Sequence, residues 1–306
     1  MEDFALLIRE LRARLPKLSL RENEPMRAHC SFKIGGDASA MALPAAIEET
    51  EELCSFLREK GVKPLVIGNG TNLLVTDEPL HRFVIKMSDG MSAMERRGET
   101  GINALCGISL ARLAAECAHL SLSGLEFAHG IPGTLGGAAS MNAGAYGGEM
   151  KQVLRAVSYL DENIELRKKY GAELELSYRH SVFSDSDAVI LSCELELIKG
   201  GEEEILAKMR ELSEKRRASQ PLDKPSAGST FKRPETGYAA ALIEQAGLKG
   251  FTLGGAQVSD KHAGFVINRA GASFEDVIRL MDYIKETVYK RTGIVLEPEV
   301  KIIDNG

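Results

Sequence analysis

Apolar side chains recur at helical spacing along several stretches of the chain, with shorter apolar or alternating stretches between them. The first helix is expected to begin at Phe4 and to end at Pro16. Further helices are predicted at 45–60, 109–120, 202–218 and 238–246, and a long one opens with the capping box of Ser273 and Asp276. Strands are predicted at 64–67, 83–87, 153–161, 164–168, 172–177, 189–198, 256–258, 265–268 and 294–303. Pro298 confines the last of these to a sheet edge or a bulge.

The order of these elements predicts an α+β protein of three parts. The alternation over 153–198 predicts an antiparallel or mixed sheet. Residues 124–148 hold eight glycines and are expected to contain no regular element. The three parts are residues 1–88, joined by the C-terminal strand at 294–306, then residues 89–200, and then residues 201–293.

Composition narrows the class of protein. The 306 residues are enough for about two domains with an ample core. A net charge of −6 and a pI near 5.7 disfavour nucleic-acid binding. No apolar run approaches the ~20 residues that span a bilayer, and the N-terminus lacks the uninterrupted apolar stretch of a signal peptide. The five cysteines form no CxxC pair, so we expect reduced thiols, no metal site and a cytoplasmic protein without membrane insertion.

The first candidate binding motif is the loop 68–72, Gly-Asn-Gly-Thr-Asn, which directly follows a predicted strand. Glycines there allow successive N–H groups to point at an anion and form a nest for phosphates. The loop is not a Walker A motif, because no Gly-Lys-Ser/Thr follows. It is not a dinucleotide fingerprint either, because Leu73 stands where the third glycine belongs. A plain turn after a strand explains the motif equally well.

The second candidate is the glycine-dense segment from Gly130 to Gly148, which contains no Asp, Glu, Lys or Arg. A long exposed loop is one explanation, but exposed loops are usually charged. A neutral segment of small residues is better explained by burial against something flat or bulky. We therefore favour a bound cofactor at this segment.

Three polar residues and one basic stretch are further candidates for a catalytic or substrate-binding role. Arg179 follows a predicted strand, Ser229 stands on a glycine-hinged turn, and Glu299 lies in an apolar terminal strand. Their ordinary explanations are a surface ion pair for the arginine and a turn or capping role for the serine, which local sequence favours. A buried Glu299 needs a partner, which Arg179 could supply. Residues 208–233 carry eight Lys/Arg against three Asp/Glu, which fits a solvated helix face or a site for a diphosphate-bearing substrate.

Five motifs, taken together and in order, resemble one family, the UDP-N-acetylenolpyruvoylglucosamine reductases, MurB-type flavoenzymes of bacterial peptidoglycan precursor synthesis. They are GNGTNLLV at 68–75, GIPGTLGGAASMNAGAYGGE at 130–149, YRHSVF at 178–183, AGSTFKRP at 227–234 and EPEV at 297–300. The resemblance covers nearly the whole chain, from Ser31 to Val300. One such motif alone would be weak evidence for a family, whereas five motifs in the family's order are specific evidence for it.

The resemblance implies an FAD-binding fold of the vanillyl-alcohol-oxidase (PCMH) type in two subdomains, followed by an α+β substrate-binding domain. It also implies non-covalently bound FAD, NADPH as the reductant, and a UDP-sugar substrate. That substrate is the enolpyruvyl ether of UDP-N-acetylglucosamine, and the product is UDP-N-acetylmuramate. The residues that the resemblance places around FAD are Gly68, Asn69, Gly70, Thr71, Asn72, Leu73, Gly130, Ile131, Pro132, Gly133, Thr134, Gly136, Gly137, Asn142 and Ala143.

By the same resemblance, Ser229 gives a proton to C2 of the enolpyruvyl group, while Arg179 and Glu299 polarise its carboxylate and stabilise the enolate-like intermediate. The residues expected to bind the substrate are Tyr178, Lys224, Gly228, Lys232 and Arg233. Only residues 184–187 separate the YRHSVF motif from the next predicted strand. The chain therefore resembles the short subclass, which lacks the inserted tyrosine that folds over the substrate.

Two other functions fit parts of the pattern. One is an FAD-dependent oxidase of the same fold that acts on a small alcohol or sugar, and such enzymes often tether FAD covalently through histidine. The other is a non-catalytic flavin electron-carrier subunit. This second function explains the glycine loops but leaves Ser229, Glu299 and the third part of the chain without a role. We expect a monomer that binds no nucleic acid.

Overall fold

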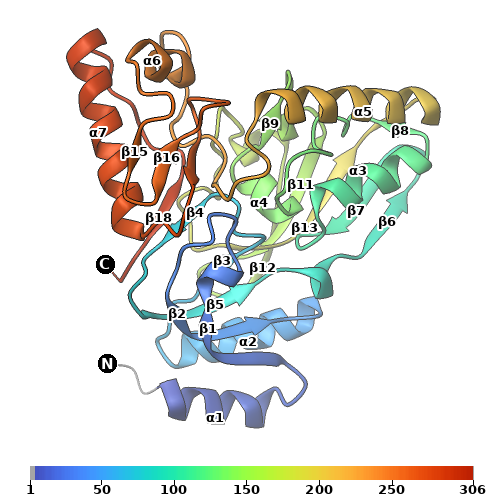
Figure 1. Ribbon diagram of the computed structural model, residues 1–306. Helices are drawn as coiled ribbons and strands as arrows, with labels where there is room; N and C mark the ends of the chain where they lie inside the picture. Colours follow the sequence, from blue (N-terminus) through green and yellow to red (C-terminus); the bar gives the residue numbers. More distant parts are fainter. Residues whose placement is uncertain (1–3, 306) are drawn as a thin grey trace. The chain divides into compact units, whose positions relative to one another are not determined.

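The structure is a computed structural model that describes residues 4–305 (Figure 1). The chain forms two compact units. Unit 1 comprises residues 4–22, Ala40–Asn69 and Arg82–Lys215, and unit 2 comprises Asn23–Ser39, Gly70–His81 and residues 216–305. Each unit is assembled from segments that are far apart in the sequence. The division into residues 1–88, 89–200 and 201–293 stays a prediction.

The first core of unit 1 combines two amphipathic helices with a sheet. Helices α1 (Phe4–Arg14) and α2 (Ile47–Glu59) contribute the fully buried Leu11, Leu53 and Leu57, which recur at helical spacing. Phe83 and Ile85 of strand β5 lie in the same cluster. The sheet has the order β1-β2-β5-β3, with the bounds Ser19–Pro25, Asp37–Leu43, Leu80–Lys86 and Leu65–Ile67.

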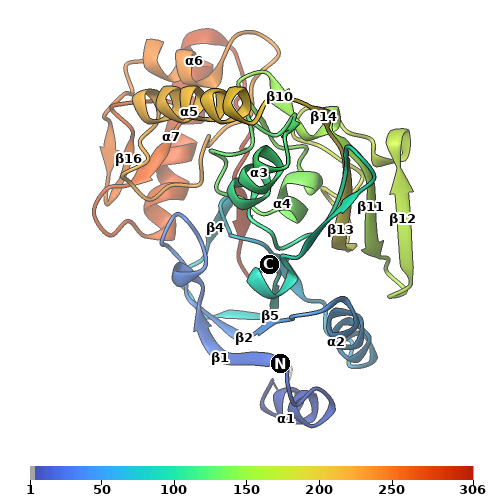
Figure 2. The same cartoon turned by 90° about the vertical axis from the view of Figure 1, so that its right-hand side faces the viewer.

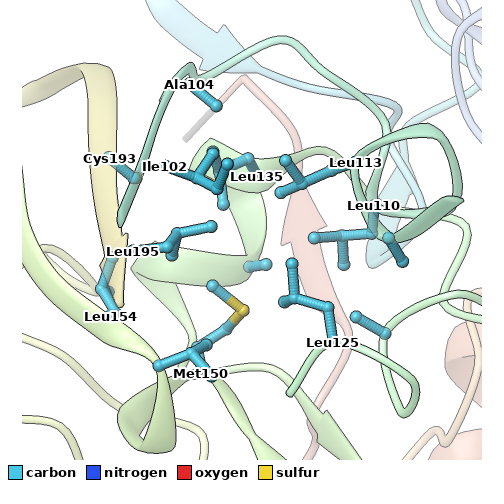
Figure 3. Close-up of a cluster of buried hydrophobic side chains, with 14 of the residues drawn as sticks. Ile102, Ala104, Leu110, Leu113, Leu125, Leu135, Met150, Leu154, Cys193 and Leu195 are labelled. Carbon is cyan, nitrogen blue, oxygen red and sulfur yellow. The ribbon is translucent and has the colours of Figure 1, made fainter. Parts of the chain in front are cut away.

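The second core of unit 1 lies against a five-stranded antiparallel sheet (Figure 3). The strands run in the order β12 (Leu166–Tyr170), β11 (Leu154–Leu160), β13 (Val189–Glu196), β7 (Gly101–Leu105) and β6 (Met94–Arg97). Ile102 and Leu195 of the sheet share this core with Leu113 of α3 (Leu110–His119) and Leu135 of α4 (Leu135–Ser140). Ser109 caps α3, as predicted. The antiparallel pairing confirms the sheet predicted for 153–198.

Unit 2 is built on a three-stranded antiparallel sheet and two helices (Figure 2). The sheet has the order β15 (Thr252–Leu253), β16 (Ala256–Val258) and β17 (Val266–Asn268). Helix α7 (Phe274–Thr292) packs on β15 and β16 and contacts α6 (Ala239–Gln245). Met281, Ile284 and Val288 form the buried stripe as predicted, but Ile278 is only partly buried, and Val277 and Leu280 complete the stripe in its place.

The last strand of unit 2 pairs with residues from the first third of the chain. Strand β18 (Lys301–Ile303) runs parallel to β4 (Leu73–Val75), so the strand predicted at 294–303 is shorter than expected. Pro298 lies before it and forms only an isolated bridge to Phe231, because proline cannot donate to a ladder. The remaining elements are η1 (Met26–Ala28), η2 (Asp89–Met91), β8 (Leu122–Ser123), β9 (Gly144–Ala145), β10 (Gly148–Glu149), η3 (Met150–Gln152), η4 (Gly171–Leu174), β14 (Ile198–Lys199) and α5 (Glu202–Ser219).

Two predicted assignments are wrong. The glycine-rich residues 124–148 contain helix α4 and the β9–β10 hairpin. Close packing against β7 and a capping threonine outweigh the low helix propensity of glycine there. Residues 172–177, predicted as a strand, form η4 and a turn instead. The Glu173 carboxylate accepts the N–H of Tyr170 at 2.9 Å and Glu175 adopts a left-handed conformation, so the chain bends.

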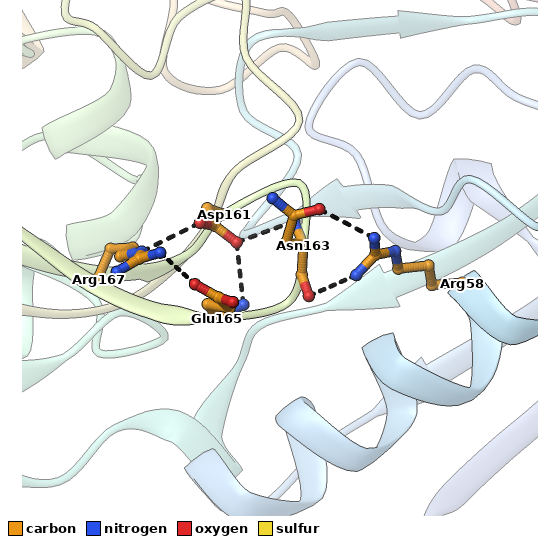
Figure 4. A network of polar contacts seen from close by, with 5 residues as sticks. All are labelled: Arg58, Asp161, Asn163, Glu165 and Arg167. Atoms are coloured by element: carbon orange, nitrogen blue, oxygen red, sulfur yellow. Dashed lines mark hydrogen bonds and ion pairs between the residues drawn. The ribbon is translucent and has the colours of Figure 1, made fainter.

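A polar network within unit 1 joins α2 to the hairpin of β11 and β12 (Figure 4). Arg58 donates from Nη2 to Oδ1 of Asn163 at 2.9 Å and from Nη1 to the main-chain oxygen of the same residue. Asp161 accepts the main-chain N–H groups of Glu165 and Asn163 at 2.9 and 2.8 Å and pairs with Arg167. These contacts lower the pKa of Asp161, with the N–H of Glu165 the largest cause. The network fixes the turn between the two strands.

All five cysteines are free and buried. Burial raises the pKa of the Cys54, Cys106 and Cys117 thiols to about 12, and thiols in such surroundings are poor nucleophiles. They therefore act as small packing residues. Among residues 4–305, no helix combines the length and the apolar character needed to cross a membrane.

Candidate active site

The loop 68–72 connects β3 to β4 and leaves its donors free. Gly70 requires glycine, because its φ is +61° and an added Cβ would lie 2.2 Å from the main-chain oxygen of His29. Among the described residues, no protein acceptor binds the main-chain N–H groups of residues 68–72. These donors, which apart from that of Gly70 belong to half-buried residues, can therefore donate to water or to a bound anion.

The carbonyl groups of the same loop are held by protein. The N–H of Ser31 donates to Gly70 O at 3.1 Å, and Ser31 Oγ lies 3.4 Å from Thr71 O. The main-chain oxygen of Asn72 accepts the N–H of Lys301 at 2.9 Å. With the carbonyl groups of residues 70–72 held and its N–H groups without a protein partner, the loop is suited to an anion, and its role as a phosphate nest stays a prediction.

Residues 130–137 lie beside Asn69 in unit 1. Asn69 Nδ2 donates to Pro132 O at 2.9 Å, and an added Cβ at Gly68 would lie 2.2 Å from Oγ1 of Thr134. Thr134 is buried and caps α4 by accepting the N–H of Gly137 at 3.4 Å. Asn69 therefore joins the two predicted cofactor segments, and the low charge of the second follows from its packing against protein as well as from any ligand.

Asn142 and Ala143 follow α4 and are buried. The Asn142 amide donates to Ser177 O at 2.9 Å and to the Glu149 carboxylate at 3.1 Å, and its oxygen accepts the N–H of Lys151 at 2.8 Å. The N–H of Ala143 donates within the protein as well, to Ala138 at 2.9 Å. Both residues therefore support the fold of this segment, and their role as cofactor contacts stays a prediction.

Arg179 stands on a tight turn between Ser177 and His180, which form an isolated bridge. Its φ of +54° is rare for a residue with a side chain and indicates that surrounding contacts impose the conformation. Its Nη1 donates to Gly144 O at 3.4 Å, and its guanidinium lies 5.3 Å from the centre of the exposed Tyr178 ring. The half-buried guanidinium thus lies beside the glycine-rich segment, at the first strand of the β9–β10 hairpin.

Two serines after Arg179 hold this turn against the end of α4. Ser181 Oγ and Ser184 Oγ donate to Ser140 O at 2.6 and 2.8 Å. Residues 184–187 form only a turn before β13 begins at Val189. The turn leads directly into β13, and membership of the short subclass stays a prediction.

Unit 2 brings Ser229 and Glu299 onto neighbouring segments. Thr230 O accepts the N–H of Glu299 at 2.8 Å, and the N–H of Lys232 donates to Glu297 O at 2.8 Å. Ser229 and Glu299 are both half-buried. Gly228, just before Ser229, has a φ of +77°, and an added Cβ there would meet nothing within 4 Å. The left-handed backbone conformation, and not close packing, therefore requires glycine at this position. Pairing of Arg179 with Glu299 would join residues of different units and stays a prediction.

The segment around Ser229 is anchored from both sides. Thr230 donates its N–H to Gly264 O at 2.9 Å, and its buried hydroxyl accepts the N–H of Val266 at 2.9 Å. Ser31 Oγ donates to Ser226 O at 2.6 Å. Sequence reasoning noted Ser31 only as the start of the resemblance and missed this link between the loop 68–72 and the Ser229 segment, because nothing local in the sequence indicates it.

The basic stretch 208–233 has two different halves. On α5, Lys215 and Lys208 both pair with Glu211 and lower its pKa to about 2. This half of the stretch therefore fits the first explanation, a solvated helix face. The other half, in unit 2, contains the exposed Lys224, Lys232 and Arg233. There Lys232 Nζ lies 3.5 Å from the Glu297 carboxylate and Arg233 lies over the ring of Tyr238, 4.2 Å from its centre. That these exposed cations bind a diphosphate stays a prediction.

The site residues contain no cluster typical of a metal centre. Across residues 4–305, no group of three or more His, Cys, Asp or Glu side chains is arranged to hold a metal ion. The free N–H groups of 68–72 and the neutral segment 130–137 instead fit a large phosphate-bearing cofactor.

Comparisons with known proteins match two regions of this chain to known protein families. Residues 38–167 match the family described as FAD binding domain, and residues 220–303 match the C-terminal domain of UDP-N-acetylenolpyruvoylglucosamine reductase. The UDP-N-acetylenolpyruvoylglucosamine reductase of Caldanaerobacter subterraneus subsp. tengcongensis is 45% identical, covering 97% of this chain and 98% of the relative. That of Alkaliphilus oremlandii is 46% identical, covering 92% of each chain.

A solved structure agrees with these matches. The crystal structure of UDP-N-acetylenolpyruvylglucosamine reductase (MurB) from Thermus caldophilus superimposes with a TM-score of 0.79 at 30% identity, covering 94% of this chain and 99% of that one. The predicted α+β fold with an FAD-binding region of the vanillyl-alcohol-oxidase type is thereby confirmed. On the sequence match over nearly its whole length, the chain belongs to the UDP-N-acetylenolpyruvoylglucosamine reductase family.

Proposed function

We propose that this chain reduces the enolpyruvyl ether of UDP-N-acetylglucosamine to UDP-N-acetylmuramate, with NADPH as the electron donor and FAD as the carrier, in peptidoglycan precursor synthesis. The observation that carries the proposal is the presence, in one chain, of a matched FAD-binding region and a matched reductase C-terminal domain. The C-terminal domain also holds Ser229 and Glu299 on adjacent segments.

The residues of the loop 68–72 and of 130–137 fit FAD by the chemistry of their donors. The unpaired N–H groups of 68–72 would bind the cofactor's pyrophosphate, and Asn69 would keep the loop against Pro132. FAD, when bound, would supply the hydride chemistry that links oxidation of NADPH to reduction at C3 of the enolpyruvyl group. The small neutral residues of 130–137 would exclude water from that exchange.

Arg179 would stabilise the charge that develops on the substrate. Addition of hydride to a C=C bond conjugated with a carboxylate moves electron density onto that carboxylate. A guanidinium presents a planar fork of donors that matches a carboxylate, and a preorganised donor needs no reorganisation during the reaction. The left-handed turn and the contact with Gly144 O hold Arg179 in place before substrate binds.

Ser229 would donate the proton that completes the reduction. The hydride at C3 and the proton at C2 together convert the C=C bond to a single bond, while NADPH becomes NADP⁺. A serine hydroxyl is a weak acid, so it serves only if the developing carbanion is strongly basic or a neighbour lowers its pKa. Glu299, on the segment paired with that of Ser229, would help to stabilise the enolate-like intermediate.

The UDP moiety would bind through the exposed cations of unit 2. Lys224, Lys232 and Arg233 are positive and accessible, and Gly228 leaves open space beside Ser229. Tyr178, exposed beside Arg179, offers an aromatic face to the substrate. We further propose a cytoplasmic, monomeric enzyme, in keeping with a substrate and a reductant that are both soluble nucleotides.

The direct test combines purified protein, NADPH and the enolpyruvyl sugar nucleotide under anaerobic conditions. Absorbance at the nicotinamide band should fall only when the sugar nucleotide is present. Acid treatment should release free FAD, and oxygen should reoxidise the flavin slowly. Covalently retained flavin with rapid oxidase turnover would favour the oxidase instead. Flavin reduction without any sugar-dependent turnover would favour an electron-carrier subunit.

A further inference from the structure

Two asparagines of the loop 68–72 make the same kind of contact with different partners. Asn69 Nδ2 donates to Pro132 O and Asn72 Nδ2 donates to Glu299 O, each at 2.9 Å. Both side chains are half-buried. The first contact joins two segments expected to hold the cofactor, whereas the second joins the loop to a residue expected to act on the substrate.

The contact of Asn72 belongs to a continuous set within unit 2. Directly after it, β4 begins and pairs in parallel with β18, and Asn72 O accepts the N–H of Lys301 at 2.9 Å. On the opposite side, the N–H of Glu299 donates to Thr230 O at 2.8 Å. The main chain of Glu299 is therefore held at both polar groups, by Thr230 at its N–H and by Asn72 at its C=O.

The side-chain amide of Asn72 sets the orientation of the peptide that follows Glu299. Leu296 and Val300 anchor the segment in the core, with 1% and 4% of their surfaces exposed, but apolar packing is not directional. A hydrogen bond to the carbonyl is directional. Without it, this peptide would keep only the long hydrogen bond from the N–H of Val300 to Thr230 O at 3.5 Å. Its orientation would then be less fixed, and the carboxyl of Glu299 would move with it.

We propose that Asn72 is a positioning residue that holds Glu299 for the substrate half of the reaction, in addition to any role of its main chain in binding FAD. The inference rests on the function proposed above. A displacement of about 1 Å at a reacting group costs about 100-fold in rate. Loss of the Asn72 amide should therefore slow reoxidation of the flavin by the sugar nucleotide about 10- to 100-fold.

The test compares Asn72→Ala and Asn72→Asp with the matched control Asn69→Ala in the FAD-loaded enzyme. Asn72→Asp keeps the shape of the side chain but replaces the donor with a carboxylate, which repels the Glu299 carbonyl. Both Asn72 variants should show the slowed reoxidation, and this slowing should exceed any change in the rate of flavin reduction by NADPH by about tenfold or more. Asn69→Ala should lose flavin, and its ratio of the two rates should stay near that of the unchanged protein.

Amide hydrogen exchange of the holoenzyme supplies a readout that does not depend on turnover. Peptides covering residues 296–303 should exchange faster in Asn72→Ala than in Asn69→Ala. Equal slowing of both half-reactions, unchanged reoxidation in both Asn72 variants, or loss of flavin with no change in exchange at 296–303 would each overturn the inference. If the reduced flavin of the unchanged protein is not reoxidised by the sugar nucleotide, the proposed function fails, and the inference fails with it.

Discussion

Three tightly packed glycines of unit 1 and the glycine before Ser229 in unit 2 are required for different reasons. In unit 1, a Cβ at Gly68, Gly136 or Gly148 would lie 2.2, 2.9 or 2.5 Å from atoms of Thr134, Cys106 or Phe127. In unit 2, a Cβ at Gly228 would meet nothing within 4 Å, and the residue is glycine because its φ is +77°. Close packing thus determines the first set and backbone direction determines the second.

This difference indicates that the packed glycines of unit 1 and the turn before Ser229 contribute separable properties. Gly68, Gly136 and Gly148 leave no room for a Cβ, as expected of segments that hold a large cofactor in a fixed place. The turn before Ser229 has space beside it, as expected of a segment that a substrate approaches. Flavin retention and proton delivery should therefore respond to different substitutions.

The largest effect that would sharpen the comparison is expected at Arg179, which lies in unit 1 but is assigned to the substrate. Arg179→Ala should retain FAD and should slow reoxidation by the sugar nucleotide about 10²–10³-fold, because a preorganised donor to the developing charge is lost. Arg179→Lys should recover little of the lost reoxidation rate, because an ammonium group lacks the planar fork of donors. Stopped-flow absorbance measures both rates. Loss of flavin from Arg179→Ala would show that this residue supports the cofactor and not the substrate.

Substitutions at Gly148 in unit 1 and at Gly228 in unit 2 should differ in their effects on stability and on flavin content. The added side chain overlaps Phe127, and overpacking typically costs about 1–3 kcal/mol. Gly148→Val should therefore lower the unfolding temperature and the flavin content together. Gly228→Ala should cost about 1–2 kcal/mol from its left-handed conformation alone and should keep its flavin. Absorbance ratios and thermal unfolding check both, and flavin loss from Gly228→Ala would erase the distinction.

Asp276 should affect unit 2 alone. Its carboxylate accepts the N–H groups of Gly255 and Ser273 at 3.0 and 3.1 Å, which lowers its pKa, with Gly255 the largest cause. Asp276→Ala should cost about 1 kcal/mol through loss of the cap on α7. Because the pKa is lowered in the folded state, this contribution is present above the ordinary carboxyl pKa and is lost as the pH falls through the lowered value. Denaturant unfolding at pH 7 and at a pH below the ordinary carboxyl pKa should show the difference between the two proteins shrinking, and an equal difference at both pH values would contradict it.

The smallest effect is expected on the Michaelis constant for the sugar nucleotide. Lys232→Glu should raise that constant about twofold to fivefold with little change in flavin content, because an exposed cation contributes about 1 kcal/mol or less. Lys208→Glu is the control, since Lys208 pairs with Glu211 on α5. Similar changes in both variants would mean that the whole basic stretch acts as a solvated surface.

Local signals explain which parts of this fold could be predicted from sequence. The helix capped by Ser273 has both a capping box and a regular apolar stripe, and its start and most of its stripe were predictable. Strand β1 buries none of its residues fully, so its pattern gives no alternation to read. Helix α4 was missed because contacts with β7, remote in sequence, stabilise glycines that disfavour a helix by themselves.

In the candidate site, too, local signals are readable from the sequence but tertiary contacts are not. The motifs around Gly70, Arg179, Ser229 and Glu299 are visible in sequence because glycine and charge stand out there. The hydrogen bonds that connect the segments of Gly70, Ser229 and Glu299 are not visible in the sequence. Ser31 and Ser226, for example, lie almost two hundred residues apart and are ordinary serines in their local context. Which asparagine of the loop supports the cofactor and which supports Glu299 depends on tertiary contacts that spacing alone does not reveal.

The measurement that tests the central claim most directly is stopped-flow spectroscopy of both half-reactions in Ser229→Ala. Reduction of the flavin by NADPH requires no proton transfer to carbon, so its rate should stay near that of the unchanged protein. Reoxidation by the enolpyruvyl sugar nucleotide needs a proton at C2 and should slow by about 10²–10⁴-fold, with Ser229→Cys retaining more activity because a thiol can still donate. Equal slowing of the two half-reactions, or no slowing of either, would contradict the assignment and leave Ser229 as a turn residue.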